Sequence, residues 1–189
     1  MIVPSRFRAI IDDLYKVEGK AELVAGEVVR FMASGDLPST VALDIAIALR
    51  GFVRQTGRGA AFGDGVGYAL PAPLANERES FQPDASYFDG PRPPNRLRFL
   101  EGAPTFAVEV RSENDYGPAA EREMAAKRAD YFQAGTLVVW DVDTLRDQVV
   151  HVYRASDPAA PTTYRRGEQA EAEPAVPDWS MPVDDLFPD

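Results

Sequence analysis

The sequence contains no cysteine and a single histidine, His151. The absence of cysteine excludes disulfide bonds, thiol nucleophiles, zinc–thiolate sites and iron–sulfur clusters. The chain has no Gly-x-Ser-x-Gly motif either, so a serine–histidine or cysteine–histidine mechanism has no support, and we interpret His151 as structural. A metal ion bound by this chain would therefore be held by oxygen atoms or by this one imidazole.

Long apolar runs are also missing. No run approaches the roughly 20 residues that span a bilayer, and the first segment, MIVPSRFRAI, lacks the basic, apolar and small-residue order of a signal peptide. We therefore expect a cytoplasmic protein. The 189 residues, of which 45% are hydrophobic and 26% charged, predict one globular domain over residues 1–189.

Basic residues are fewer than acidic residues, and the formal net charge is -10. This charge disfavours nonspecific adhesion to nucleic acid, since phosphate contacts need clustered lysine and arginine side chains. Basic residues nevertheless gather in two places, which are Arg50, Arg54 and Arg58, and Arg92, Arg96 and Arg98. A local basic surface is therefore compatible with the acidic chain.

Hydrophobic and turn patterns predict a mixed sheet with helices packed against it. Branched residues around an Ala-Gly turn predict a hairpin over residues 22–32. Apolar residues at helical spacing predict a helix over residues 39–56, and Pro118 and Gly135 mark the start and end of a second helix. Strands are expected in GRGAAFGDGVGYAL, as two strands around a turn, and in FQPDASYFD, PTFAVEVRS, LVVWDV and VVHVY, whereas residues 89–103 and 155–178 are expected to form surface loops.

Two of these strands carry charged residues that could meet. Glu109 and Arg111 project to the same face of one strand, because side chains alternate along it. Asp84 follows a proline at the start of another strand. Neighbouring strands could bring Asp84 and Glu109 to one point, where oxygen ligands suit Mg²⁺. The alternatives are an exposed charged pair for Glu109 and Arg111, and a turn residue for Asp84.

Lys127 supplies an independent indication. Helical spacing groups it with Met124 and Tyr131, on the side that should pack on the sheet. Its ammonium could reach the carboxylates and orient or activate an attacking water. The alternative is a lysine that extends along the edge of the apolar stripe into solvent. Glu22 and Glu27, which flank the hairpin turn, are expected to be solvated.

A series of short motifs runs through most of the chain. The motifs are Glu22-Leu23-Val24-Ala25-Gly26-Glu27, Pro83-Asp84, Glu109-Val110-Arg111-Ser112, Lys127 with Tyr131 and Gly135, Trp140-Asp141-Val142-Asp143, and Val176-Pro177-Asp178-Trp179-Ser180-Met181-Pro182 with Leu186-Phe187. In order and spacing they resemble the Uma-two family of restriction endonuclease-like proteins, which belongs to the PD-(D/E)XK nuclease superfamily.

The resemblance implies an α/β fold with a restriction endonuclease-like mixed β-sheet flanked by helices and an N-terminal β-hairpin. It implies a divalent metal, Mg²⁺ or Mn²⁺, held by Asp84 and Glu109, and it raises Glu27 as a further metal-binding carboxylate. It also implies a catalytic lysine. The superfamily's usual position for this lysine, two residues after the glutamate, is occupied by Arg111, which leaves Lys127 as the candidate. Arginine stays protonated and is a poor general base.

The leading hypothesis is Mg-dependent hydrolysis of phosphodiester bonds in DNA, with Asp84, Glu109, Lys127 and Arg111 as catalytic residues. A homodimer is expected, since two sites related by a twofold axis can cut both strands. One alternative is a catalytically silent binding or scaffold module with the same fold, which the acidic net charge favours. Another is a hydrolase of small phosphorylated molecules, which would need no basic groove.

Overall fold

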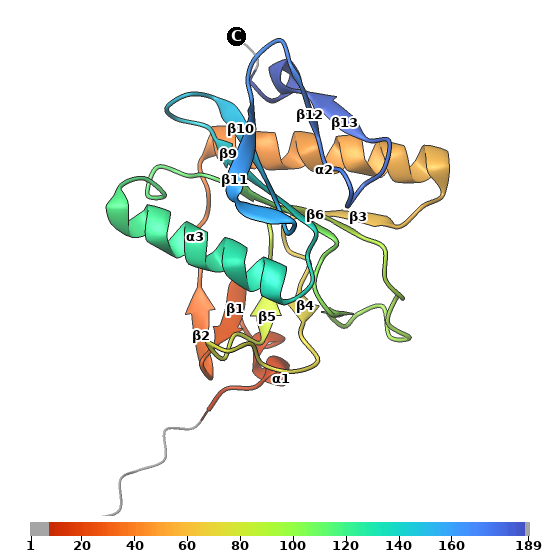
Figure 1. Cartoon of the computed structure of the whole chain (residues 1–189). Coiled ribbons are helices and arrows are strands. Elements are labelled where there is room, and N and C mark those ends of the chain that lie inside the picture. The colour runs from red at the N-terminus through yellow and green to blue at the C-terminus, as the bar shows by residue number, and fades with distance from the viewer. Residues whose placement is uncertain (1–7, 188–189) are drawn as a thin grey trace, which may run out of the picture.

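The centre of the molecule is a six-stranded sheet in the order β11-β10-β9-β8-β6-β3 (Figure 1). The computed structural model describes residues 8–187. The strands are β3 (Ala60–Gly63), β6 (Ala85–Phe88), β8 (Phe106–Val110), β9 (Val138–Asp143), β10 (Val149–Arg154) and β11 (Asp157–Tyr164). Strands β8 and β9 pair in parallel, whereas the other neighbours are antiparallel. The prediction of a mixed sheet is therefore confirmed.

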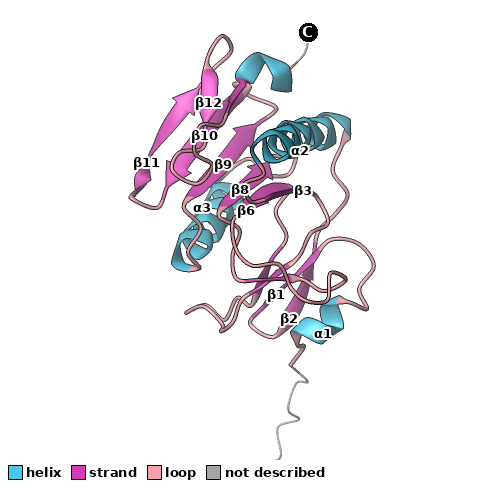
Figure 2. Cartoon of the chain, turned by 90° about the vertical axis from the view of Figure 1, so that its right-hand side faces the viewer, coloured by secondary structure: helices cyan, strands magenta, loops and turns pink. Residues whose placement is uncertain are grey.

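Two helices cover opposite faces of this sheet (Figure 2). Helix α2 (Asp36–Thr56) packs on β3, β6 and β8, and helix α3 (Pro118–Gln133) lies against β9. Helix α2 begins ahead of the predicted residue 39 and ends at Thr56. It is capped by Gly57, whose φ of 68° is the left-handed conformation that favours glycine. Among the described residues, no helix combines the length and the apolar character needed to cross a bilayer.

Strand β8 shows how the sheet separates core from site. Phe106, Val108 and Val110 point into the large core under α2, as the alternating pattern predicts. Glu109 points to the opposite face, where it meets side chains of α3. Strand β9 is buried along its whole length, which agrees with its continuous apolar run.

A second, smaller part of the fold lies beyond one end of the sheet (Figure 1). It consists of α1 (Ile11–Leu14), the hairpin of β1 (Ala21–Val24) and β2 (Glu27–Arg30), and a sheet of β5 (Ser80–Phe81), β4 (Tyr68–Ala69) and β7 (Leu100–Glu101). The predicted hairpin is confirmed, and both turn residues, Ala25 and Gly26, have positive φ, as a tight two-residue turn requires. Strand β7 lies within residues 89–103, which we expected to be all loop.

The expectation that residues 155–178 form a surface loop is wrong. This segment contains the edge strand β11 and strand β12 (Gln169–Glu171), which pairs with β13 (Ser180–Pro182) ahead of the short helix η1 (Val183–Leu186). Its small apolar residues are buried in the core under α2, namely Ala170, Ala172, Ala175 and Val176. The prolines that suggested a loop are tolerated in β11 because it is an edge strand.

Candidate active site

Asp84 immediately precedes β6 and is hydrogen-bonded to β8 on both sides of Glu109. Ala85 pairs with Val108, and the N–H of Asp84 donates to the Val108 carbonyl at 3.0 Å. The Asp84 Oδ2 accepts a hydrogen bond from the Val110 N–H at 2.7 Å. The two carboxylates lie near each other, because the Asp84 charge adds to the effect of burial in raising the pKa of Glu109. The fold thus brings together the two carboxylates that the sequence singles out.

Two side chains of α3 hold Glu109. Lys127 Nζ lies 2.9 Å from its Oε2, and the Tyr131 hydroxyl donates to its Oε1 at 2.6 Å. Burial raises the pKa of Glu109, with Lys127 opposing this effect and Asp84 adding to it. Burial alone would lower the pKa of Lys127, but the Glu109 and Glu22 carboxylates outweigh it and raise that pKa. Lys127 therefore faces the site, as its helical spacing predicts, and carries its charge there.

A second lysine reaches the site from the segment before β1. Lys20 Nζ contacts Asp84 Oδ1 and lies 3.3 Å from Asp64 Oδ1. The other Asp84 oxygen accepts a hydrogen bond from the Val110 N–H at 2.7 Å. Burial lowers the pKa of Lys20, whereas Asp84 and Glu109 raise it by more. Sequence reasoning missed Lys20, because no local pattern marks it and only the fold carries the hairpin to Asp84.

Glu22, expected to be solvated, is fully buried beside this cluster. Its carboxylate contacts Arg78, lies 3.1 Å from Lys127 Nζ, and accepts the Gln82 N–H at 3.0 Å. These partners outweigh burial and lower the pKa of Glu22. The expectation for Glu22 is wrong because the hairpin packs on β5, so that β1 is buried on both of its faces.

Glu27, the third metal-binding carboxylate that the resemblance suggests, is not brought to this cluster. It is exposed and pairs with Val24 beside the hairpin turn. Lys20 and Phe31 lie at the opposite, open end of the hairpin, where the Phe31 N–H donates to the Lys20 carbonyl. The buried acidic position of this motif is therefore Glu22, at the other end of the Glu-Leu-x-x-Gly-Glu sequence.

The site forms a ladder of charged side chains with an excess of acid. Neighbours in this ladder form ion pairs, except Asp84 and Glu109, which repel each other, and its members in order are Asp64, Lys20, Asp84, Glu109, Lys127, Glu22, Arg78 and Asp130. Five carboxylates stand against three cations, which leaves a formal charge of -2. Within residues 8–187, no three acidic or histidine side chains converge in an arrangement that could hold a metal ion as they stand. Lysine ammonium groups contact Asp84 and Glu109 instead.

A cavity lies at the end of this ladder that contains Asp64 and Asp84. The cavity has a volume of about 310 Å³, and its walls include Ser39 and Leu43 of α2 together with Asp64 and Asp84. The Phe31 ring lies over both ammonium groups, and its centroid is 5.9 Å from Lys20 Nζ and 5.2 Å from Lys127 Nζ. A ligand can thus approach Asp84 from the α2 side, while an aromatic ring covers the two lysines.

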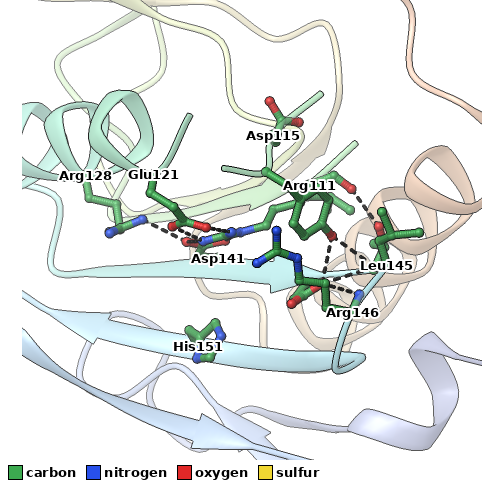
Figure 3. A network of polar contacts seen from close by, with 12 residues as sticks. Arg111, Asp115, Glu121, Arg128, Asp141, Leu145, Arg146 and His151 are labelled. Atoms are coloured by element: carbon green, nitrogen blue, oxygen red, sulfur yellow. Dashed lines mark hydrogen bonds and ion pairs between the residues drawn. The ribbon is translucent and has the colours of Figure 1, made fainter. Parts of the chain in front are cut away.

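Arg111 belongs to a different network (Figure 3). Its guanidinium binds Asp141 at 2.6 and 2.9 Å and also contacts Glu121, while Arg128 binds Asp141 at 2.8 Å. Asp141 lies beside Glu109 in the β8–β9 pairing, so Arg111 is close to the candidate site along the chain. Its donors nevertheless point to Asp141 and Glu121, because these carboxylates lie nearer than Glu109.

His151 lies in β10, apart from the two candidate carboxylates. Its Nδ1 is 2.9 Å from the Thr163 hydroxyl of β11, within the antiparallel pairing of these strands. Figure 3 shows its ring beneath the Arg111 network, with no interaction drawn between them. This position agrees with a structural interpretation.

Comparison with known proteins gives a family and a fold. The Uma2 family, described as "Putative restriction endonuclease", matches residues 11–184. No curated protein matches the chain. A solved structure described as a putative nuclease belonging to DUF820 from Anabaena variabilis has a TM-score of 0.72 and 18% sequence identity, and the match covers 94% of this chain and 96% of that one. The fold is therefore nuclease-like, and the chain belongs to the Uma2 family of restriction endonuclease-like proteins.

Proposed function

We propose that this protein is a metal-dependent nuclease that hydrolyses phosphodiester bonds of DNA at Asp84 and Glu109. One observation carries the proposal. Asp84 lines a cavity and is hydrogen-bonded to the residues on both sides of Glu109, and the Lys127 ammonium lies 2.9 Å from Glu109. Acids and a positioned cation of this kind suit the chemistry of phosphate esters, in which negative charge develops as the bond breaks.

The residues fit a divalent cation such as Mg²⁺ or Mn²⁺. Carboxylate oxygens are the ligands these ions prefer, and the chain has no sulfur ligand that would favour a softer metal. The charge of -2 matches such an ion, and the Lys20 ammonium already acts as a cation on Asp84. Asp84 and Glu109 would hold the ion, which when bound would polarise the phosphate and lower the pKa of a water molecule.

Lys127 has the clearest role among the protein's own groups. It is anchored between Glu109 and Glu22, so its ammonium is held in one place. A cation fixed in this way can donate hydrogen bonds to the attacking oxygen and offset the charge that develops on the phosphate. Tyr131 fixes the other oxygen of Glu109 through its hydroxyl. Together they orient Glu109 before any substrate arrives.

An arginine surface supports a nucleic-acid substrate. Burial lowers the pKa of Arg92, and the positive charges of Arg96 and Arg50 lower it further, so the two arginine groups of the sequence approach each other. In the described part of the chain, no carboxylate lies within ion-pair distance of Arg50, Arg54, Arg92 or Arg96, whereas Arg58 and Arg98 are paired. On α2, Arg50 follows Leu43 of the cavity wall by two helical turns.

The central test is a titration with Mn²⁺ and Mg²⁺, followed by thermal unfolding and by nicking of supercoiled plasmid. At a concentration 100-fold above Kd, a bound ion should stabilise the native protein by about 2.7 kcal/mol. Asp84→Asn should remove both this stabilisation and the cleavage. Asp157→Asn, an equal change of charge at an exposed position in β11, should preserve both. A wild-type protein that neither binds the ions nor cuts DNA would favour the scaffold alternative.

The substrate is tested separately with Glu109→Gln protein, which should bind DNA without cutting it. Adding Arg92→Ala and Arg96→Ala should reduce the slope of log affinity against log salt by about 0.9 for each phosphate that the protein no longer neutralises. Arg122→Ala, at an exposed position of α3, is the matched control and should leave the slope unchanged. Hydrolysis of a small phosphodiester without any DNA binding would favour the small-molecule alternative. The homodimer stays a prediction, to be tested by sedimentation.

A further inference from the structure

Lys20 differs from the other cations of the site in the exposure of its carboxylate partners. Its ammonium contacts Asp84, whose side chain is 16% exposed, and lies 3.3 Å from Asp64, whose side chain is 59% exposed. Lys127, in contrast, lies between Glu109 and Glu22, which are 15% and 1% exposed. Of the two lysines, only Lys20 has one partner inside the site and one at its mouth.

We infer that Lys20 holds the position of a divalent cation on Asp84, and that Asp64 receives its ammonium when such an ion binds. This inference rests on the proposed metal site at Asp84 and Glu109. It makes Lys20 a positioning residue that keeps the acidic site assembled before the ion arrives, and it makes Asp64 part of the ion-binding equilibrium without being an ion ligand.

The need for a transfer follows from charge. A metal ion and an ammonium group repel each other, so both cannot occupy the same Asp84 oxygen. A lysine that left Asp84 without a new partner would be an unpaired charge, since its side chain is only 17% exposed. Asp64 removes this penalty because it is already within ion-pair distance of the ammonium.

The backbone allows the side chain to move alone. The Lys20 carbonyl accepts the Phe31 N–H at 3.0 Å, which fixes the residue at the open end of the hairpin. The four-carbon stem of lysine is flexible, and its ammonium carries three rotatable donors. Asp64 and Asp84 both line the cavity of about 310 Å³, so the transfer proceeds along one cavity wall. No rearrangement of strands is required.

The test is the Mn²⁺ affinity of four proteins measured by calorimetry: wild type, Lys20→Met, Asp64→Asn and the double variant. If Lys20 occupies Asp84 in about nine of ten ion-free molecules, its removal should tighten binding about tenfold, because the competent fraction rises to one. Asp64→Asn should weaken binding several-fold, since Lys20 then stays on Asp84. The double variant should match Lys20→Met, because Asp64 acts only through Lys20.

Two controls separate this inference from other effects. Lys16→Met removes an equal charge at an exposed lysine that pairs with Asp13, so an equal gain in affinity there would reduce the effect to net charge and overturn the inference. Lys20→Gln keeps a polar stem and replaces Lys20→Met if that variant fails to fold. Unchanged or weaker Mn²⁺ binding in Lys20→Gln would also overturn it.

The same measurements test the proposed metal site independently of the role of Lys20. If Asp84→Asn abolishes Mn²⁺ binding while Lys20→Met has no effect on it, the metal site stands and only the role of Lys20 is wrong. If wild type binds no Mn²⁺, or if Asp84→Asn leaves its binding unchanged, the metal site is wrong and the inference falls with it.

Discussion

Two charged networks lie side by side under α3, and they differ in charge balance. Around Arg111, two cations, Arg111 and Arg128, face two carboxylates, Asp141 and Glu121. In the neighbouring site around Asp84 and Glu109, five carboxylates face three cations. The charges of the network around Arg111 cancel. The site around Asp84 and Glu109 carries an excess of negative charge that a ligand can neutralise.

The two networks also differ in access. Asp141 is completely buried, and Arg111 covers it. Asp84, by contrast, lines a cavity that opens along α2. Removing one partner from a buried and balanced ion network is destabilising. An acidic cluster beside a cavity holds carboxylates that repel each other, which is typical of functional sites. We therefore assign the first network to the fold and the second to chemistry, and the following variants test that division.

The largest effect is expected for Lys127→Met. The substitution keeps an unbranched apolar stem of similar length and removes the cation between Glu109 and Glu22. Cleavage by the folded protein should fall by roughly 10²- to 10⁴-fold, the range of a positioned catalytic group. Plasmid nicking rates corrected for folded fraction measure this loss. Activity within a few-fold of wild type would remove Lys127 from the chemistry and would break the division between the networks.

The next effect is expected for Arg111→Met, and it concerns stability. Removing this cation leaves Asp141 with only Arg128 in a buried environment, which should lower the free energy of unfolding by about 3–5 kcal/mol. Urea denaturation measures this change. Activity per folded molecule should fall less than in Lys127→Met, because Arg111 contacts neither Asp84 nor Glu109 among its hydrogen bonds. The opposite ranking would return the catalytic cation to the strand.

The division also explains what the sequence could predict. Glu109 and Lys127 follow from local periodicity, because alternation fixes the face of a strand residue and helical spacing fixes that of a helix residue. The partners of Arg111 do not follow, since Asp141 and Glu121 become its neighbours only when β9 and α3 pack together. Lys20 contacts Asp84 across a long sequence separation, through the docking of a hairpin. No local pattern contains that information.

Burial of charged or small residues was equally hard to predict. The sequence predicts Glu22 to be a solvated strand residue. It is buried instead, because β5 packs on its strand and its carboxylate pairs with Arg78 and Lys127. The segment with Ala170 reads as a loop, although its alanines fill the core under α2. In both cases the decisive contacts are with distant segments, which a window of neighbouring residues does not represent.

The smallest effect is expected for Glu27→Gln, which tests whether Glu27 belongs to the acidic site. Glu27 is exposed beside the hairpin turn, so its neutralisation should change the free energy of unfolding by no more than about 1 kcal/mol, the upper range for an exposed ion pair. Mn²⁺ affinity and plasmid nicking should match those of Glu18→Gln, an equal change at another exposed glutamate before the hairpin. A drop in Mn²⁺ affinity seen with Glu27→Gln alone would instead show that this end of the hairpin folds toward Asp84 when the ion binds. In that case the acidic network would include Glu27, as the family motif suggests, and its negative charge would be larger than the contacts around Lys20 and Lys127 account for.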